Sequence, residues 1–310
     1  MQGTHEHAAD ARNENILIDI NGSLMPRADA KISVFDSGFI LGDGVWEGLR
    51  VERGTIVFLE QHLTRLFEGM VTLDIPRDFS HEDMSRRLYR ALEANGMQDG
   101  VHVRLMVSRG VKSTPYQDPR MTVTPPTVVI IPEYKAPARE TLERGVRLYT
   151  VYTRRGYPDV QDPVLNTHSK LNCIVACIQA TKAGADEALM LDPQGFVATC
   201  NSTHFFVVRH GELWTSSGNY CLDGITRRNV LEIAAELDIV AHEKTFSLHD
   251  VYNATEAFVT GTFAGLAPVA EVDGRPIGSA AERPMLERLR AGYRARIERY
   301  VAEQGPSHAR

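Results

Sequence analysis

The sequence predicts a mixed α/β fold in two domains. Strand-like and helix-like apolar patterns alternate along the chain, and 310 residues are more than most single hydrophobic cores contain. An apolar strand then runs into a polar, proline-bearing stretch, which is typical of a domain boundary. The expected parts are a flexible lead-in (1–15), a small α/β domain (16–133), an interdomain connection (134–141), a larger domain (142–300) and a C-terminal tail (301–310).

The small domain is expected to combine strands with two amphipathic helices. ILIDI (16–20) and KISVFD (31–36) indicate strands, whereas LEQHLTRLFEGM (59–70) has apolar residues at helical spacing. A second helix is expected to begin after Ser80, because Asp83 stands where a capping box needs an acidic residue.

A further strand is expected in VHVRLMVSRG (101–110), where apolar and polar residues alternate as in a half-buried strand. His102 and Arg104 therefore share one face of that strand. The larger domain is expected to contain strands at VRLYTVYT (146–153), EALMLD (187–192), GFVAT (195–199), THFFVVR (203–209) and EAFVTG (256–261), with helices after Lys170, Thr226 and Arg283.

Composition and charge exclude several classes of function. The chain is 43% hydrophobic and 24% charged, as soluble proteins are, and no apolar run approaches the ~18 residues of a membrane span. A net charge of -6 with scattered basic residues argues against nucleic-acid binding. The N-terminus lacks the features of a secretion signal, so a cytoplasmic location is expected. The cysteines show neither disulfide nor zinc spacing, so we expect reduced thiols, no metal site and a small-molecule ligand.

Three segments are candidates for binding a phosphate group. DGITRRNVLEIAAEL offers the backbone N–H groups of Ile225 and Thr226, and the Thr226 hydroxyl, at a helix start. A plain threonine N-cap is the alternative there. Thr262 in VTGTFAG lies in either a second anion-binding turn or an ordinary tight loop. Arg65, on the predicted helix at 59–70, is either a phosphate clamp or a surface arginine.

Lys170 is a candidate for amine chemistry. In LNTHSKLNCIVACIQA it stands among short polar residues just before an apolar, helix-like run. A lysine that attacks a carbonyl needs a polar but sheltered position, which a loop entering such a helix provides; a solvated surface lysine is the alternative. Arg65, Lys170, Thr226 and Thr262 together are the parts needed to hold a phosphorylated aldehyde.

The segments taken together resemble the fold type IV pyridoxal-phosphate enzymes. This class includes branched-chain and D-amino acid aminotransferases, R-selective amine transaminases and aminodeoxychorismate lyase. The resemblance implies a small α/β domain, a larger pseudo-barrel domain, a homodimer, and pyridoxal 5′-phosphate bound between the domains. The matching segments, in the same order, are SVFDSGFILGDGVWEGLRV, FLEQHLTRL, SKLN, DEALMLDPQGFVAT, GITRRNVLEIA and FVTGTFAGLAPVAEVDGRPIG.

The resemblance also implies a role for each candidate residue. Lys170 is the internal Schiff base and proton shuttle, while Arg65, the Ile225 backbone, Thr226 and Thr262 form the phosphate cup. A substrate amine displaces Lys170, the freed lysine moves a proton from substrate Cα to cofactor C4′, and hydrolysis releases a keto product. A second carbonyl substrate runs this half-reaction backwards, which is a ping-pong mechanism.

Two positions depart from the pattern of the class. Thr199 stands where a glutamate usually keeps the cofactor ring nitrogen protonated, and a hydroxyl cannot do this equally well. Either activity is slow, or another group such as His204 supplies the proton, or Thr199 has only a structural role. In addition, Lys170 precedes Asn172 by two residues, whereas the class generally has three or four.

The substrate candidates also come from the resemblance. His102 and Arg104 match the strand that branched-chain aminotransferases use for substrate, and Arg104 aligns with an arginine that binds a distal carboxylate. An arginine on a solvated strand face is the alternative. Phe39 stands where many relatives have a carboxylate-binding tyrosine, and Trp46 is expected to pack the pocket wall or the core.

The leading hypothesis is a pyridoxal-phosphate aminotransferase acting on a branched-chain or similar hydrophobic amino acid, a D-amino acid or an R-amine, with a keto acid as acceptor. An aminodeoxychorismate-lyase-like enzyme and a non-catalytic binding scaffold are the alternatives.

Overall fold

The computed structural model describes residues 3–5, 7–278 and 282–305. The chain divides into two compact units. The first unit comprises residues 8–136, 166–170 and the described residues from Glu298 onward. The second unit comprises the described residues before Ala8, together with residues 137–165 and 171–297. The division therefore follows no single boundary, and Lys170 belongs with the first unit although the helix after it belongs with the second.

The two ends of the chain differ from the expected lead-in and tail. Residues 1–2, 6 and 306–310 of those segments lie outside the described residues. In the described part of the lead-in, the Asp10 side chain caps a 3-10 helix, η1 (Ala11–Asn15). Helix α9 (Pro284–Gln304) includes the first four residues of the expected tail.

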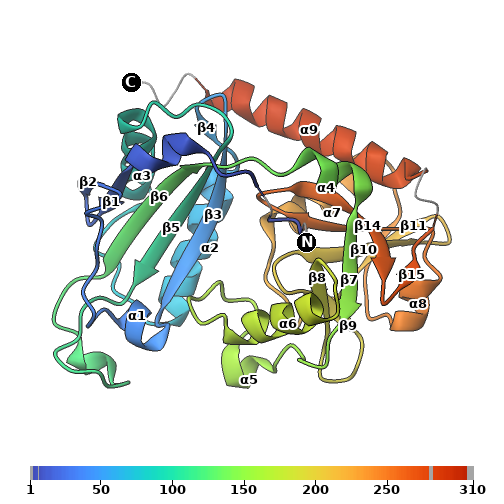
Figure 1. Ribbon diagram of the computed structural model, residues 1–310, viewed down its shortest axis with the longest axis horizontal. Helices are drawn as coiled ribbons and strands as arrows, with labels where there is room; N and C mark the ends of the chain where they lie inside the picture. Colours follow the sequence, from blue (N-terminus) through green and yellow to red (C-terminus); the bar gives the residue numbers. More distant parts are fainter. Residues whose placement is uncertain (1–2, 6, 279–281, 306–310) are drawn as a thin grey trace. The chain divides into compact units, whose positions relative to one another are not determined.

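In the first unit, the described strands form a six-stranded antiparallel sheet in the order β2-β1-β6-β5-β3-β4 (Figure 1). The strands are β1 (Leu17–Ile20), β2 (Ser23–Pro26), β3 (Gly44–Glu52), β4 (Thr55–Ile56), β5 (Val101–Ser108) and β6 (Thr127–Tyr134), and the helices are α1 (Ser37–Leu41), α2 (Leu59–Thr72) and α3 (His81–Ala94), with a 3-10 turn, η2 (Pro119–Met121). The expected capping box of Ser80 and Asp83 starts α3, so that prediction is confirmed.

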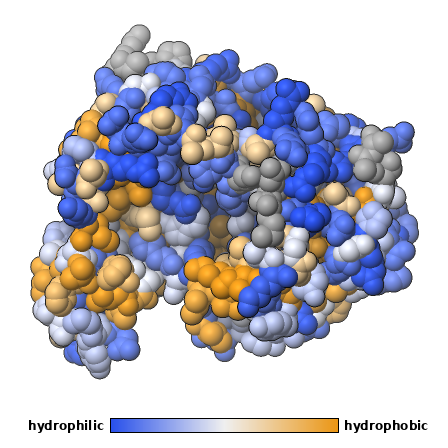
Figure 2. All heavy atoms as spheres, in the orientation of Figure 1, coloured by the Kyte–Doolittle hydropathy of each residue, from blue (hydrophilic) through white to orange (hydrophobic). Residues whose placement is uncertain are grey.

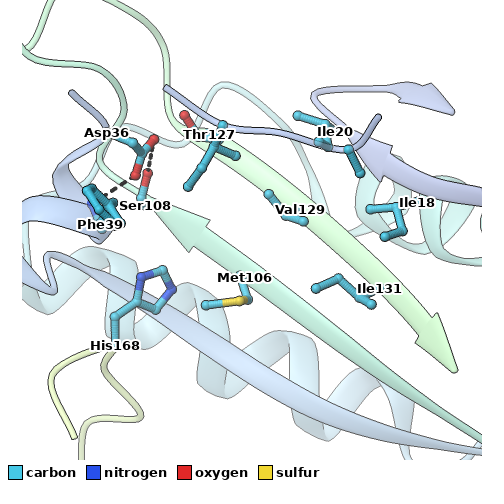
Figure 3. A pocket seen from close by; sticks show the side chains of 13 residues that line it. Ile18, Ile20, Asp36, Phe39, Met106, Ser108, Thr127, Val129, Ile131 and His168 are labelled. Atoms are coloured by element: carbon cyan, nitrogen blue, oxygen red, sulfur yellow. Dashed lines mark hydrogen bonds between the residues drawn. The ribbon is translucent and has the colours of Figure 1, made fainter. Parts of the chain in front are cut away.

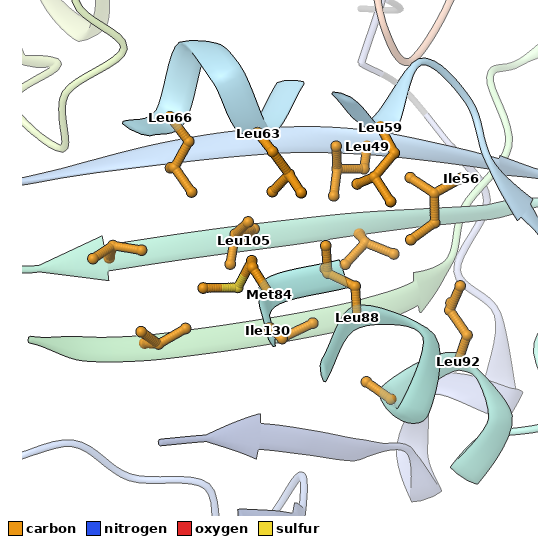
Figure 4. Packing of buried hydrophobic residues seen from close by; sticks show 14 of the residues in the cluster. Leu49, Ile56, Leu59, Leu63, Leu66, Met84, Leu88, Leu92, Leu105 and Ile130 are labelled. Carbon is orange, nitrogen blue, oxygen red and sulfur yellow. The ribbon is translucent and has the colours of Figure 1, made fainter. Parts of the chain in front are cut away.

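Helices α2 and α3 pack against one face of this sheet. Leu63 on α2 and Leu88 on α3 are fully buried against Leu105 on β5 and Ile130 on β6 (Figure 4). Because strand side chains alternate, Trp46 on β3 and its neighbours on β5 lie on the opposite face. His102 and Arg104 share that opposite face, as predicted. His102 and Arg104 are thus on the face opposite α2 and α3.

One predicted strand is wrong. Residues 31–36 form no strand, and only Asp36 makes an isolated bridge, to Val111. The apolar side chains that suggested a half-buried strand, including Val34 and Phe35, are exposed. Their alternation indicates an apolar surface segment that leads into α1.

In the second unit, the described strands form a nine-stranded sheet whose main path is β12-β11-β10-β13-β14-β7-β8-β9, with β15 paired to β14. The strands are β7 (Val146–Thr150), β8 (Glu187–Leu191), β9 (Val197–Cys200), β10 (His204–Arg209), β11 (Glu212–Thr215), β12 (Ala241–Glu243), β13 (Glu256–Gly261), β14 (Gly265–Val272) and β15 (Arg275–Pro276). The helices, besides α9, are α4 (Arg139–Arg144), α5 (Pro158–Gln161), α6 (Leu171–Lys182), α7 (Ile225–Glu236) and α8 (Leu248–Tyr252).

The sheet of the second unit returns on itself. Its path ends at β9, and a short turn connects β9 directly to β10 in the interior of the path. The backbone N–H of Cys200 donates to the carbonyl of Thr203 at 3.0 Å across that turn. The predicted pseudo-barrel is therefore confirmed, and each strand expected from the sequence in this unit is present.

Candidate functional site

The segment that carries Lys170 is fixed to the start of β3. Trp46 N–H donates to the carbonyl of Asn166 at 3.0 Å, and the Asn166 amide donates back to the Trp46 carbonyl at 2.6 Å. His168 N–H donates to the Gly44 carbonyl at 2.9 Å. Residues 166–168 therefore extend the sheet of the first unit, and Lys170 follows two residues after this anchor, immediately before α6.

The His168 ring completes the anchor. Its Nε2 lies 3.0 Å from the Val45 carbonyl, so Nε2 carries the hydrogen that it donates. Burial lowers the pKa of His168, although the bond to Val45 opposes this. A Cβ at Gly44 would lie 2.7 Å from the ring, and one at Gly38 would lie 2.8 Å from it. These glycines leave the space that the imidazole occupies.

Trp46 connects the candidate lysine with the candidate substrate arginine. Its indole Nε1 donates to the Thr167 carbonyl at 3.0 Å, which fixes the ring against the same anchored segment. The Arg104 Cζ lies 3.8 Å from the centre of the indole, and the Lys170 Nζ lies 5.6 Å from it. Burial lowers the pKa of Arg104, and the negative charges of Glu133 and Glu47 oppose this. The structure thus brings Lys170 and Arg104 to one aromatic side chain.

Arg65 is held by a buried carboxylate that was not identified from the sequence. The Arg65 Nε donates to Glu47 Oε1 at 2.8 Å, and the Arg65 Nη2 donates to Glu47 Oε2 at 2.6 Å. His62 Nδ1 lies 2.7 Å from the same Oε2. Burial alone would raise the pKa of Glu47, but the charge of Arg65 and the bond from His62 lower it to about 2. Burial lowers the pKa of His62 itself, although the bond to Glu47 opposes this.

The start of α7 is the candidate phosphate site in the second unit. Gly224 is the N-cap and makes no side-chain cap bond, while Ile225 and Thr226 are the first two helical residues, both buried. The alternative that Thr226 is itself the N-cap is therefore wrong. A Cβ at Gly224 would lie 2.2 Å from the His204 ring, so the imidazole packs directly on the helix start. His204, considered as an alternative proton source, has its Nε2 2.7 Å from the Leu222 carbonyl, so that nitrogen is engaged with the backbone.

Two other threonines of the second unit lie at strand ends. Thr199 is buried on β9, and its hydroxyl donates to the Thr203 carbonyl at 2.9 Å. Thr262 is half-buried in the turn that follows β13. On β13 itself, the Thr260 hydroxyl is buried with no hydrogen-bond partner among the described residues. The sequence gives no sign of Thr260, because nothing in EAFVTG shows that this hydroxyl lacks a partner in the folded chain.

Phe39 lines a pocket whose described lining includes neither Lys170 nor Arg104. It is 68% exposed on α1, and this pocket of about 400 Å³ lies in the first unit (Figure 3). The pocket is mostly apolar, with His168 and the hydrogen-bonded pair Asp36 and Ser108 as polar lining. His102 is half-buried and does not line this pocket. Met106, which does line the pocket, shares one face of β5 with His102 and Arg104.

No described helix is both long and apolar enough to cross a membrane. Among the residues that the structure describes, no group of three or more His, Cys, Asp or Glu side chains is arranged to hold a metal ion. The four cysteines are free thiols.

Comparison with known proteins identifies the family. The family model for amino-transferase class IV matches residues 44–272. The chain is 32% identical over 281 residues to a branched-chain-amino-acid aminotransferase of Pseudomonas aeruginosa, covering 88% of this chain and 90% of the relative. This chain therefore belongs to the class IV aminotransferases.

Two more similarities refine this placement. The chain is 36% identical to branched-chain-amino-acid aminotransferase-like protein 1 of Arabidopsis thaliana, covering 92% of this chain and 51% of the relative. It thus spans about half the length of that plant protein. Among solved structures, a branched-chain amino acid aminotransferase complexed with N-(5′-phosphopyridoxyl)-L-glutamate superposes with a TM-score of 0.85 at 28% identity, covering 93% of this chain and 97% of that chain. The fold is that of the fold type IV enzymes.

Proposed function

We propose that this chain is a pyridoxal-phosphate-dependent aminotransferase. It moves an amino group from a branched-chain or similar hydrophobic amino acid to a keto acid by a ping-pong mechanism. The observation that carries this proposal is the anchored segment 166–170, which holds Lys170 beside the indole that Arg104 also contacts. An amine and a guanidinium at one side chain supply what amino-acid transamination requires, because the amine handles a carbonyl and the guanidinium binds a carboxylate. Membership of class IV supports this assignment.

The residues of the second unit fit a phosphate group. The first N–H groups of α7 have no side-chain cap, and the N-terminus of a twelve-residue helix favours an anion. Thr260, the residue before Gly261 and Thr262, has a buried hydroxyl with no described partner. Such a hydroxyl costs stability unless a ligand or water satisfies it. We assign the phosphate to the Ile225 backbone, Thr226 and Thr262, with Arg65 supplying positive charge.

The remaining roles follow from the chemistry of each side chain. Bound pyridoxal phosphate supplies an electrophilic aldehyde and a ring that accepts electron density from the substrate Cα. Lys170 is the amine that would hold that aldehyde, and its Nζ would carry the proton taken from the substrate Cα. Arg104 binds a substrate carboxylate, with His102 beside it on β5. Thr199 stands in place of the carboxylate that usually bonds the cofactor ring nitrogen. A hydroxyl there would leave that nitrogen less protonated.

We also propose a homodimer in the cytoplasm. Each unit has an apolar surface that a second copy of the chain would cover, and Figure 2 shows hydrophobic surface over α1 and over α6. On α6, Leu171, Ile174 and Ile178 are exposed at helical spacing. The corresponding surface of the first unit includes Phe39. In a dimer, Phe39 would therefore remain a candidate for contact with the substrate. The exposed residues of that surface are Ile32, Val34, Phe35, Phe39 and Leu41.

The dimer is tested by measuring mass in solution. Light scattering should give twice the 34.5 kDa of the chain. A charge at Ile174 (Ile174→Lys) should shift the population to monomer, because it places an ammonium in an apolar contact. Val240→Lys is the matched control, since Val240 is also exposed but lies elsewhere in the second unit. A monomeric wild-type protein would reject the assembly.

The enzyme activity is tested by absorbance. The apo-protein is titrated with pyridoxal phosphate, and then L-leucine, D-alanine and an R-amine are added in turn. The proposal predicts that one donor bleaches the visible band of the bound cofactor and that 2-oxoglutarate restores it. Lys170→Ala should lose the band and all turnover, and normal transamination by this variant would reject the assignment. Pyruvate release without an acceptor would identify the lyase instead, and failure of the wild type to bind the cofactor would support the non-catalytic scaffold.

A further inference from the structure

Near its N-terminus the chain contacts the interior of the second unit. The Thr4 hydroxyl donates to Glu187 Oε2 at 3.1 Å, and Thr4 is only 3% exposed. A Cβ at Gly3 would lie 3.0 Å from the Asp186 carbonyl, so the backbone also runs close to the start of β8. Burial of a threonine this close to the beginning of the sequence is unexpected for a flexible lead-in, and its hydroxyl has a specific partner.

Glu187 is the charged residue of an otherwise apolar strand. Its Oε1 accepts hydrogen bonds from the Ser202 hydroxyl at 2.6 Å, the Thr203 hydroxyl at 2.8 Å and the Ser202 N–H at 3.2 Å. Its Oε2 accepts from Thr4. In the described part of the chain no cation pairs with this fully buried carboxyl group, so hydroxyl and amide donors alone satisfy it. Burial raises the pKa of Glu187, and these hydrogen bonds oppose that rise.

The turn held by Glu187 carries two residues considered for the cofactor ring. Thr199 stands at one side of it and donates to the Thr203 carbonyl, and His204 follows Thr203 directly. A second link to β8 comes from the Asn201 side chain, which accepts from the Ala188 N–H at 2.8 Å. The position of Thr199 thus depends on a network whose far end is Thr4.

The next described residues of the segment contact a second turn. The His5 ring stacks on Phe263, with centroids 5.8 Å apart and planes 8° apart. The His7 ring meets the edge of the same phenyl group, at 6.4 Å and 83°. Phe263 is buried and directly follows Thr262, the residue assigned to the phosphate. The segment therefore contacts both turns that carry candidate cofactor ligands of this unit.

We propose that Thr4 and His5 form a strap that positions these two turns, Thr4 through Glu187 and His5 through Phe263. Thr4, His5 and Glu187 are positioning residues, because they act through Thr199 and Thr262 and do not touch the cofactor themselves. The inference rests on the proposed function only in naming pyridoxal phosphate as the ligand of the turns. The strap itself is a property of the protein without ligand.

The strap is tested first in the apo-protein. Thr4→Val removes the hydroxyl and keeps the shape, so amide hydrogen exchange in residues 199–204 should become faster by about threefold to tenfold, the effect of one buried hydrogen bond. Thr4→Ser restores the donor and should restore slow exchange. Thr141→Val is the matched control, because Thr141 is buried in the same unit and its hydroxyl has no described partner. Unchanged exchange in Thr4→Val would overturn the proposal, whatever the protein binds.

Cofactor affinity gives the second readout. Thr4→Val and His5→Ala should each raise the apparent Kd for pyridoxal phosphate by about threefold to tenfold, whereas Thr141→Val should leave it unchanged. Glu187→Gln keeps an oxygen that accepts from Ser202 and Thr203, and its new NH2 can donate to the Thr4 hydroxyl, so this variant should lie close to wild type. Faster exchange with unaltered affinity in both strap variants would reject the positioning role. If the wild-type protein binds no pyridoxal phosphate, the proposed function fails, and the exchange experiment still decides whether the strap holds the turn.

Discussion

The buried group of Glu47, His62 and Arg65 makes acid stability a direct test of the first unit. Glu47 is fully buried, and its pKa is lowered from 4.5 to about 2. A carboxyl group whose pKa is depressed by folding contributes stability above its ordinary pKa, and that contribution is lost as the pH falls through the folded value. We therefore expect wild-type protein to lose this contribution between about pH 5 and pH 2. Glu47→Gln cannot lose it, because an amide does not titrate.

The size of the effect follows from the shift. A difference of about 2.5 pKa units corresponds to about 3 kcal/mol when Glu47 is fully ionised. By pH 3 about 2 kcal/mol of this should be gone, because the unfolded carboxyl group is by then almost fully protonated. Glu47→Gln should be less stable than wild type at pH 7, since the Arg65 charge has lost its buried partner. The difference in free energy of unfolding between wild type and Glu47→Gln should shrink by about 2 kcal/mol between pH 7 and pH 3.

Urea unfolding measured by tryptophan fluorescence gives the required free energies. The chain has two tryptophans, and a Trp214→Phe background leaves Trp46, on the same strand as Glu47, as the only reporter. Urea unfolding curves are measured for both proteins in this background at several pH values from 7 to 3. Both proteins retain His62. Free energies of unfolding that fall in parallel in both proteins would refute the reasoning, since no stability would then be linked to ionisation of Glu47.

Three further variants test the candidate site. Gly44→Ala should cost about 1–3 kcal/mol and weaken the cofactor band, because the new Cβ would lie 2.5 Å from the Val107 carbonyl and 2.7 Å from the His168 ring. Gly156→Ala, with nothing within 4 Å, is its control in thermal melts. Thr199→Glu should raise the absorbance of the ring-protonated cofactor, and an unaltered spectrum would place Thr199 away from the ring. Thr226→Val should raise the cofactor Kd by about tenfold while Thr226→Ser does not, and equal affinities would remove Thr226 from the phosphate site.

Most of the fold was predictable because local patterns agreed with tertiary structure. The strand at residues 101–110 alternates in burial as the sequence alternates in polarity, and the capping box at Ser80 is visible in three residues. The prediction of a strand at residues 31–36 was wrong for a physical reason. Alternating apolar residues indicate one buried face, but they do not say whether the chain itself or a second molecule buries it.

The candidate site was predictable only in part. Motif order pointed to Lys170, Arg65 and the start of α7, but partners distant in sequence decide how these groups are held. Glu47 lies within the matched segment, yet nothing local shows that its carboxylate binds Arg65 on the next helix. Glu187 did leave a sign, since a single acidic residue in a strand that is otherwise apolar needs buried donors. Which donors it finds, including Thr4, depends on the fold.

The unusual spacing between Lys170 and Asn172 has a structural explanation. Lys170 is positioned by the pairing of residues 166–168 with β3, and α6 begins only at Leu171. The Asn172 side chain accepts a hydrogen bond from the Cys173 N–H at 2.8 Å, and this bond lies within the first turn of α6. A change of one residue between lysine and asparagine therefore alters the helix start without moving the anchor. The spacing that should matter for the chemistry is the one from His168 to Lys170, because His168 is bonded to the sheet of the first unit through both its backbone and its ring.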